Sequence, residues 1–129
     1  MSITTPGISR KVITVGCSDD DREVLVGGNR MVDYSGRGPT AACICKPDLV
    51  APGCSVVSCS SRADKYTIKS GTSMSTPIVS GAVALLLERF PDMSNKDVKL
   101  RLRESSVDIG LPRNQQGWGL LDVGKMIGK

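Results

Sequence analysis

The chain has 129 residues, a net charge of +4 and 40% hydrophobic residues, among them one Phe, two Tyr and one Trp. These values fit one globular domain or part of one, with a core built mainly from Val, Leu, Ile and Ala. They argue against a membrane span, because the longest apolar run, 82–87, is too short to cross a bilayer. They also argue against nucleic-acid binding, because the basic residues are dispersed and stacking aromatics are few.

Cysteine usage bears on the compartment and on metals. The five cysteines are odd in number, and no charged-then-apolar leader opens the chain, so we expect reduced thiols and favour an intracellular setting. A secreted setting stays open as the alternative for a longer parent protein. Cys43, Cys45, Cys54 and Cys59 could be interpreted as a zinc site. Their spacing is not the usual paired C-x₂-C and the chain has no histidine, so separate thiols are the favoured interpretation.

The first predicted element is a strand over residues 11–17, KVITVGC. Its nearly continuous β-branched run is typical of a strand buried on both faces of a parallel sheet. In the polar stretch that follows, residues 23–26 and 30–34 could form short strands around the turn at 27–29. Residues 35–40, SGRGPT, are too rich in Gly and Pro for an element interior and are predicted as a loop.

Three further strands are predicted before the main helix. Residues 46–53, KPDLVAPG, read as a short buried strand between two prolines. Residues 55–60 and 66–69 alternate in polarity, which predicts an antiparallel pair joined by the polar connection 61–65. The turn Ser70-Gly71-Thr72 then leads directly into a helical segment.

The main helix is predicted over residues 73–90. It is apolar almost all round, which indicates a buried core helix. Pro77 removes one backbone donor, which is tolerable near the start of a helix. Phe90-Pro91 should end the helix, because the residue before a proline disfavours helical geometry.

Two further helices are predicted towards the end of the chain. Ser94, with Asp97 three positions on, indicates a capping box that opens a helix to about residue 103. Val98 and Leu102 should face inward, with Leu100 as a third candidate. Residues 108–119 are predicted as a polar, Gly-rich loop that holds the single Trp. Residues 121–127 are predicted as a terminal helix capped by Asp122.

Ser73 is the principal candidate for chemistry. A Gly-Thr-Ser turn that opens a helix places this serine where backbone N–H groups are unpaired and the helix dipole is positive. Such a site can stabilise an oxyanion. The structural alternative is that Ser73 only caps the helix. A serine nucleophile needs an adjacent base, and the absence of histidine means that no Ser–His pair can form within the chain.

The residues from Gly71 onwards, GTSMSTPIVSG, resemble the nucleophile motif of the subtilisin-like serine proteases, or subtilases. Other segments are similar to the family's motifs in the same order: VITVGCSDDD, DYSGRGPT, KPDLVAPG and the ending GWGLLD. The resemblance covers residues 12–126. It implies the C-terminal portion of an α/β catalytic domain with a doubly wound, mainly parallel sheet, a buried core helix over 73–90 and two further C-terminal helices. The whole chain, 1–129, would be one incomplete domain.

The resemblance also implies roles for individual residues. Ser73 would be the nucleophile that forms the acyl-enzyme, and its N–H would be one oxyanion donor. Thr72 and Gly71 would support the oxyanion site, and Ser70 and Met74 would lie close to the substrate. Ile78 stands where the family most often has a non-catalytic histidine.

The family's Asp and His segments and its side-chain oxyanion donor precede the region matched here, and none is present. No aspartate is nominated as the triad acid. We therefore expect a peptide-hydrolysing parent protein and an isolated chain that is inactive. The alternative is a non-catalytic module that binds a partner or associates with itself. Because half of such a sheet leaves strand edges and helix surface uncovered, we expect a homo-oligomer formed through exposed strand edges, or a partly disordered chain. No cofactor is expected. Calcium is frequent in the family, but no carboxylate cluster resembles a calcium loop, and Asp19–Asp21 is interpreted as a solvated turn.

Overall fold

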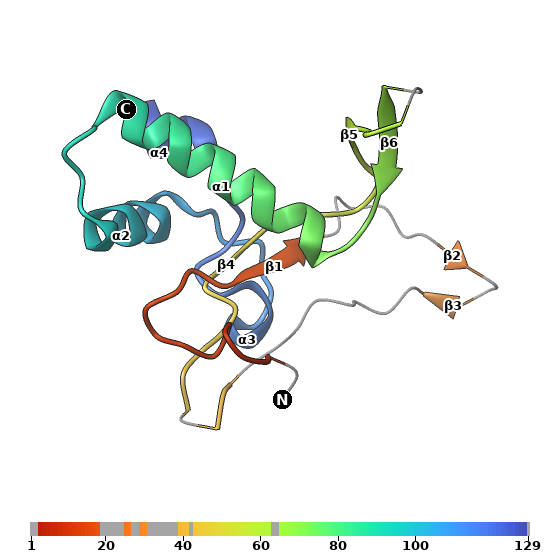
Figure 1. Ribbon diagram of the computed structural model, residues 1–129. Helices are drawn as coiled ribbons and strands as arrows, with labels where there is room; N and C mark the ends of the chain where they lie inside the picture. The colour runs from red at the N-terminus through yellow and green to blue at the C-terminus, as the bar shows by residue number, and fades with distance from the viewer. Residues whose placement is uncertain are drawn as a thin grey trace.

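The computed structural model describes residues 3–18, 39–41, 43–62 and 65–128, together with the backbone of 25–26 and 29–30. Four helices and six short strands occur in these residues (Figure 1). In chain order they are β1 (Val15–Ser18), β2 (Leu25–Val26), β3 (Asn29–Arg30), β4 (Leu49–Pro52), β5 (Val56–Cys59), β6 (Tyr66–Lys69), α1 (Thr72–Arg89), α2 (Asn95–Ser105), α3 (Arg113–Gln116) and α4 (Val123–Gly128).

The centre of the fold is a parallel pair of strands, β1 and β4, with Val15 beside Leu49 and Ser18 beside Pro52. Residues 118–121 continue this sheet, because Leu121 N–H donates to the Val50 carbonyl and Val50 N–H to the Gly119 carbonyl. The expected parallel sheet is confirmed. The strand predicted over 11–17 is shorter than expected, because Thr14 N–H donates to the Asp48 carboxylate instead of joining a strand ladder.

Helix α1 lies across β1 and β4 and carries much of the core (Figure 1). Its inward residues recur at helical spacing, and with residues of β4, α2 and α4 they form one cluster: Leu49, Ala51, Val79, Ala82, Leu86, Val98, Leu102 and Met126. The predicted core helix is confirmed, with one face buried in this cluster. Its outer face is exposed, with Leu85 48% accessible, because no described element covers it.

Strands β5 and β6 pair antiparallel, as predicted, with Val57 beside Ile68 and Cys59 beside Tyr66. The hairpin projects away from the helices (Figure 1). Strands β2 and β3 also pair antiparallel. Strand β2 lies within the predicted stretch 23–26, whereas β3 begins one residue before the predicted stretch 30–34, at Asn29 of the predicted turn. The rest of those stretches, the loop 35–38 and Asp19–Asp21 lie outside the described residues.

The end of the chain follows the local signals closely. Ser94 and Asp97 form the predicted capping box, and Asp122 Oδ1 accepts from Lys125 N–H at the start of α4. Leu100 points outward and is 51% exposed, so the expectation that it faces inward is wrong. The predicted loop 108–119 contains the short helix α3.

Over the described part of the chain, no helix combines the length and apolar content that crossing a bilayer needs.

Candidate active site

Ser73 is the second residue of helix α1, and its side chain is exposed. The N-cap position is held by Gly71, and no side chain makes a capping hydrogen bond there. Ser73 therefore does not act as the helix cap. Its hydroxyl is left at the surface, at the end of the helix where the dipole is positive.

The first turn of α1 also presents backbone donors. Met74 N–H donates to the Gly71 carbonyl. The N–H groups of Thr72 and Ser73 have no acceptor among the described residues, as expected for the start of a helix. An oxygen that develops negative charge beside Ser73 would meet these unpaired donors.

The turn before Ser73 is fixed to the end of β4 by two hydrogen bonds. Gly71 N–H donates to the Gly53 carbonyl at 2.7 Å, and Ser55 N–H donates to Ser70 Oγ at 2.7 Å. Gly71 has a φ of 145°, a conformation that side-chain-bearing residues rarely adopt. The predicted turn residues therefore hold the nucleophile candidate in a defined place, which a catalytic group requires.

Two residues that sequence reasoning missed anchor the helix start. Ser75 is fully buried, and its Oγ donates to the carbonyls of Ala51 at 2.8 Å and Pro52 at 3.1 Å. Gly53 leaves room for this contact, because a Cβ built there would collide with Ser75 Oγ, Cys17 Sγ and the Gly71 carbonyl. The sequence did contain a signal for Ser75. It stands four residues before Val79, at the helical spacing of the buried residues of α1.

The other predicted site residues lie in the turn before Ser73 or in the first turns of α1. Thr72 is half-buried, and its carbonyl accepts from Thr76 Oγ1 at 3.1 Å. Met74 is half-buried beside the turn, whereas Ser70 is exposed and its hydroxyl is used by Ser55. Pro77 lies six residues after the N-cap and cannot donate to the Ser73 carbonyl, so that carbonyl lacks its helical partner.

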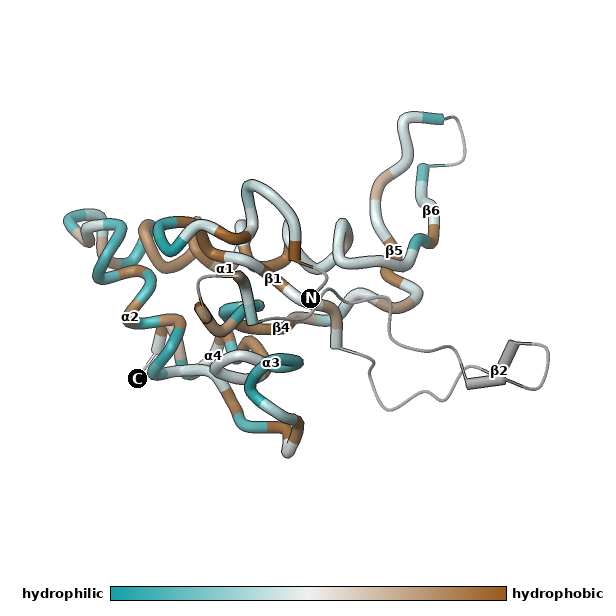
Figure 2. The backbone as a smooth tube through the Cα atoms, turned by 90° about the horizontal axis from the view of Figure 1, so that it is seen from below, coloured by the Kyte–Doolittle hydropathy of each residue, from teal (hydrophilic) through white to brown (hydrophobic). Residues whose placement is uncertain are grey.

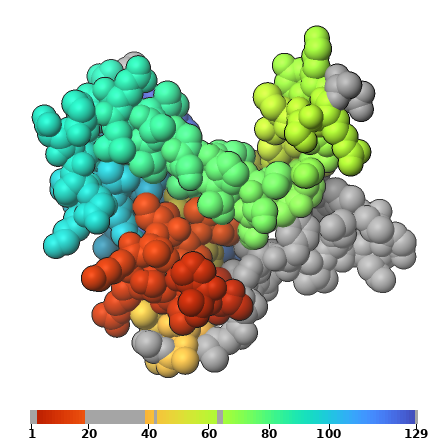
Figure 3. All heavy atoms as spheres, in the orientation of Figure 1, coloured from red at the N-terminus to blue at the C-terminus, as the bar shows by residue number. Residues whose placement is uncertain are grey.

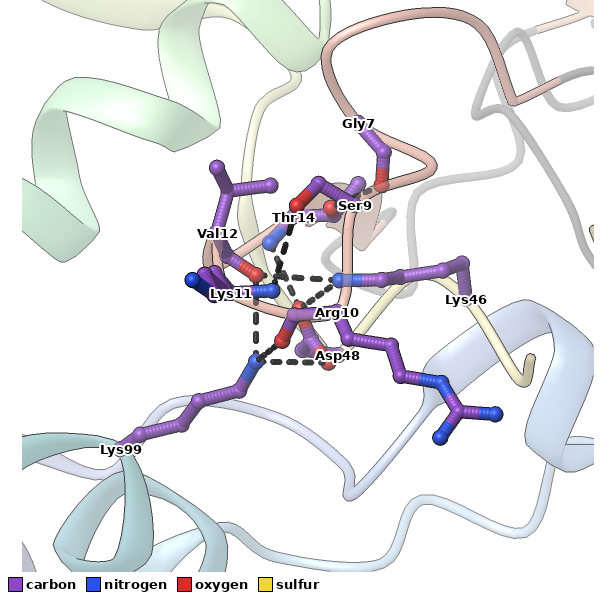
Figure 4. A network of polar contacts seen from close by, with 9 residues as sticks. All are labelled: Gly7, Ser9, Arg10, Lys11, Val12, Thr14, Lys46, Asp48 and Lys99. Atoms are coloured by element: carbon purple, nitrogen blue, oxygen red, sulfur yellow. Dashed lines mark hydrogen bonds and ion pairs between the residues drawn. The ribbon is translucent and has the colours of Figure 1, made fainter. Parts of the chain in front are cut away.

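Asp48 is buried in a polar network with Thr14, Lys46 and Lys99 (Figure 4). Its Oδ2 accepts from Lys46 Nζ at 2.6 Å and from Thr14 N–H at 2.8 Å, and Lys99 Nζ lies 3.8 Å from Oδ1. Burial lowers the pKa of the Lys99 ammonium, an effect that Asp48 opposes and Lys46 reinforces. The negative charge of Asp48 thus lies beside two lysines, Lys46 and Lys99. Both lysines also donate to the Val12 carbonyl, so the network joins the first loop to β4 and α2.

The described residues supply no base to Ser73, and histidine is absent from the whole sequence. Among the same residues, no three Cys, Asp or Glu side chains gather as metal ligands would. What the site offers is a fixed hydroxyl, unpaired N–H donors and a positive helix end. These groups suit nucleophilic attack on a carbonyl once a base is provided.

Comparison of the chain with known proteins identifies a family and several relatives. The model described as Subtilase family matches residues 1–119. The serine protease AprX of Bacillus subtilis is 38% identical over 118 residues, which cover 81% of this chain and 27% of the relative. Halolysin of Haloferax mediterranei is 32% identical over 126 residues, 98% of this chain and 22% of halolysin.

Solved structures give the same result. The CspB protease of Clostridium perfringens superposes with a TM-score of 0.79 at 29% identity, over 97% of this chain and 28% of the protease. Fervidolysin from Fervidobacterium pennivorans has a TM-score of 0.74 at 24% identity, over 95% of this chain and 20% of its own, and shows the fold alone. The expected subtilisin-like α/β fold is confirmed, and the chain spans about a quarter of the length of these proteins.

Proposed function

The chain belongs to the subtilase family, and from this premise we propose that it is the nucleophile-bearing part of a serine endopeptidase catalytic domain. The observation that carries the proposal is the state of Ser73: exposed, not used as a cap, and placed beside unpaired N–H donors at a helix start. The substrate of the parent protein would be a peptide or protein chain.

The proposed mechanism assigns each residue a role. Ser73 Oγ attacks the scissile carbonyl while its proton passes to a base. The base then gives this proton to the departing amine as the peptide C–N bond breaks and the acyl-enzyme forms. Ser73 N–H stabilises the oxyanion, supported by Thr72 and Gly71. Ser70 and Met74 flank the substrate. No cofactor is proposed, and a calcium ion in the parent protein would need ligands beyond those described.

We propose that this chain alone is inactive, because the base and acid of the triad must come from another segment. Removing the base from a Ser–His–Asp triad leaves only a small residual rate. Relatives about four times longer than the matched region leave ample chain for the missing segments. The active site would then form only when those segments pack against the exposed start of α1.

A fluorophosphonate probe, which reports an activated serine, tests this proposal. The chain alone should show no stoichiometric labelling. Mixing it with the preceding half of a relative's domain should produce labelling that Ser73→Ala abolishes and Ser80→Ala, an exposed serine on the same helix, leaves intact. Stoichiometric labelling of the chain alone, lost in Ser73→Ala, would show that the inactivity proposal is wrong.

The second candidate function is a non-catalytic module that associates with itself or with a partner. It is favoured by the outer face of α1, where Leu85 and Leu87 are exposed, and by short strand edges that could pair with other chains. Concentration-dependent mass in light scattering would support self-association. A monomer with full amide protection across residues 82–87 would contradict it.

A further inference from the structure

The hairpin of β5 and β6 has one apolar face that no described residue covers. Its pairing register places Val57 beside Ile68 and Cys59 beside Tyr66, so these four side chains share a face. Val57 is 62% exposed, and Tyr66 and Ile68 are each 65% exposed. Figure 3 shows the hairpin standing apart from the helices, and Figure 2 shows hydrophobic positions on its strands.

The opposite face of the hairpin is polar and basic. It carries Ser58, Thr67 and Lys69, with Val56 only half-buried. Lys65, just before β6, is exposed. Arg62 adds another exposed positive charge in the connection between the strands. Over residues 55–70 the sequence has three basic residues and one acidic residue, Asp64.

The hairpin also offers edges for pairing. Strands β5 and β6 form a two-stranded sheet, and neither pairs with a further strand in the described part of the chain. An isolated two-stranded hairpin is marginal in water and gains stability from a third strand. A segment added at an edge would place alternate side chains on the apolar face and the remaining ones on the basic face.

We propose that this hairpin is a docking site for an extended polypeptide segment in which apolar and acidic residues alternate. The apolar residues of the segment would cover Val57, Ile68 and Tyr66, and its carboxylates would face Lys69. The binding does not depend on whether Ser73 reacts, so it can be tested apart from the proposed protease function.

Two other occupants fit the surface less well. A second copy of the chain would bring like charges together, and lysine on an edge strand discourages identical strands from pairing. An anionic membrane would favour an apolar tip, whereas the tip here holds Ser60, Ser61 and Arg62 and the apolar residues lie along the strands.

The test uses the purified 129-residue chain and fluorescent eight-residue peptides, measured by anisotropy. A peptide of alternating Val and Glu should bind. A Val–Lys alternation, and a peptide with the Val and Glu residues segregated into two blocks, should bind at least about tenfold more weakly. Equal binding of the three peptides, or no binding of the Val–Glu peptide, would overturn the proposal.

Matched variants locate the binding. Ile68→Thr should weaken binding of the Val–Glu peptide about fivefold or more. Leu100→Thr, at another exposed apolar position on α2, should leave binding unchanged. Lys69→Glu should weaken binding of the Val–Glu peptide and strengthen that of the Val–Lys peptide. Lys96→Glu, on α2, is its charge control.

Circular dichroism checks that each variant is folded. If Ile68→Thr does not fold, Lys69→Glu still tests whether the peptide binds at the hairpin. Ile68→Thr that abolishes a concentration-dependent dimer, with no peptide effect, would assign the face to a second copy. Binding to phosphatidylserine vesicles that is lost in Ile68→Thr, again without peptide binding, would assign it to a membrane. Either result would overturn the proposal.

Discussion

Ser75 Oγ lies 2.8 Å from the Ala51 carbonyl oxygen, and this buried hydrogen bond fastens helix α1 to the end of β4 two residues after Ser73. The same hydroxyl also reaches the Pro52 carbonyl at 3.1 Å. The position of the candidate nucleophile therefore depends on a residue that itself faces the core.

Replacing Ser75 with Ala should lower the free energy of unfolding by about 1–2 kcal/mol, because a buried hydrogen bond is lost. Thr76→Ala is the control, since Thr76 is exposed and bonds only within its helix, and it should cost at most about 0.5 kcal/mol. Urea unfolding followed by circular dichroism gives both values. Equal effects of the two variants would contradict the anchoring role of Ser75.

Gly53→Ala should be among the most destabilising small substitutions in the chain, by about 2–3 kcal/mol. The added methyl group would collide with Ser75, Cys17 and the Gly71 backbone, and the turn would have to move. Gly81→Ala is the matched control. Nothing lies within 4 Å of a Cβ at Gly81, and alanine favours the helix, so stability should rise by about 0.5–1 kcal/mol. Thermal unfolding of the two variants should shift in opposite directions.

Asp48→Ala should destabilise the chain by about 3 kcal/mol or more. It would leave the ammonium group of Lys46, which is fully buried, without its carboxylate partner. Lys99→Met should cost clearly less, because the Lys99 side chain is still partly exposed and sits 3.8 Å from the carboxylate. Urea unfolding gives the free energy of unfolding of both variants. Similar losses in the two would contradict the view that the pair of Asp48 with Lys46 is the stabilising one.

The capping box predicts how stability depends on pH. Hydrogen bonds from the Ser94 hydroxyl and N–H hold the pKa of Asp97 below its usual 3.8. The folded pKa is therefore lower than the unfolded one, so the stabilisation is present above pH 3.8 and is lost as the pH falls through the folded value.

We expect Asp97→Asn to reduce the loss of stability between about pH 4 and pH 2. Ser94→Ala should have the same effect on the pH profile, because both hydrogen bonds to the carboxylate begin at Ser94 and its side chain makes one of them. Unfolding measured across this range compares the variants with the unmodified chain. An unchanged profile in Asp97→Asn would refute the assignment.

The expected and observed structures differ in β1 and at Leu100 of α2. The β-branched run over 11–17 forms a strand only from Val15, because the Asp48 carboxylate captures the Thr14 N–H. Leu100 points outward although α2 carries apolar residues on both sides of it. The strand is shortened by a partner far away in the chain, which no local pattern could reveal. Leu100 stands two positions from both Val98 and Leu102, so helical periodicity places it on the opposite side of α2 from these buried residues.

The sequence by itself determined what neighbours in the chain control: the capping box of Ser94 and Asp97, the antiparallel pair β5–β6, and the turn that places Ser73 at a helix start. Motifs in the right order also pointed to the family. Only the tertiary structure decided that Ser75 and Gly53 anchor this turn, that Lys46 is buried against Asp48, and that an outer face of α1 stays exposed. The physical reason is that caps, turns and periodicity act over a few residues, whereas burial depends on segments brought together from distant parts of the chain.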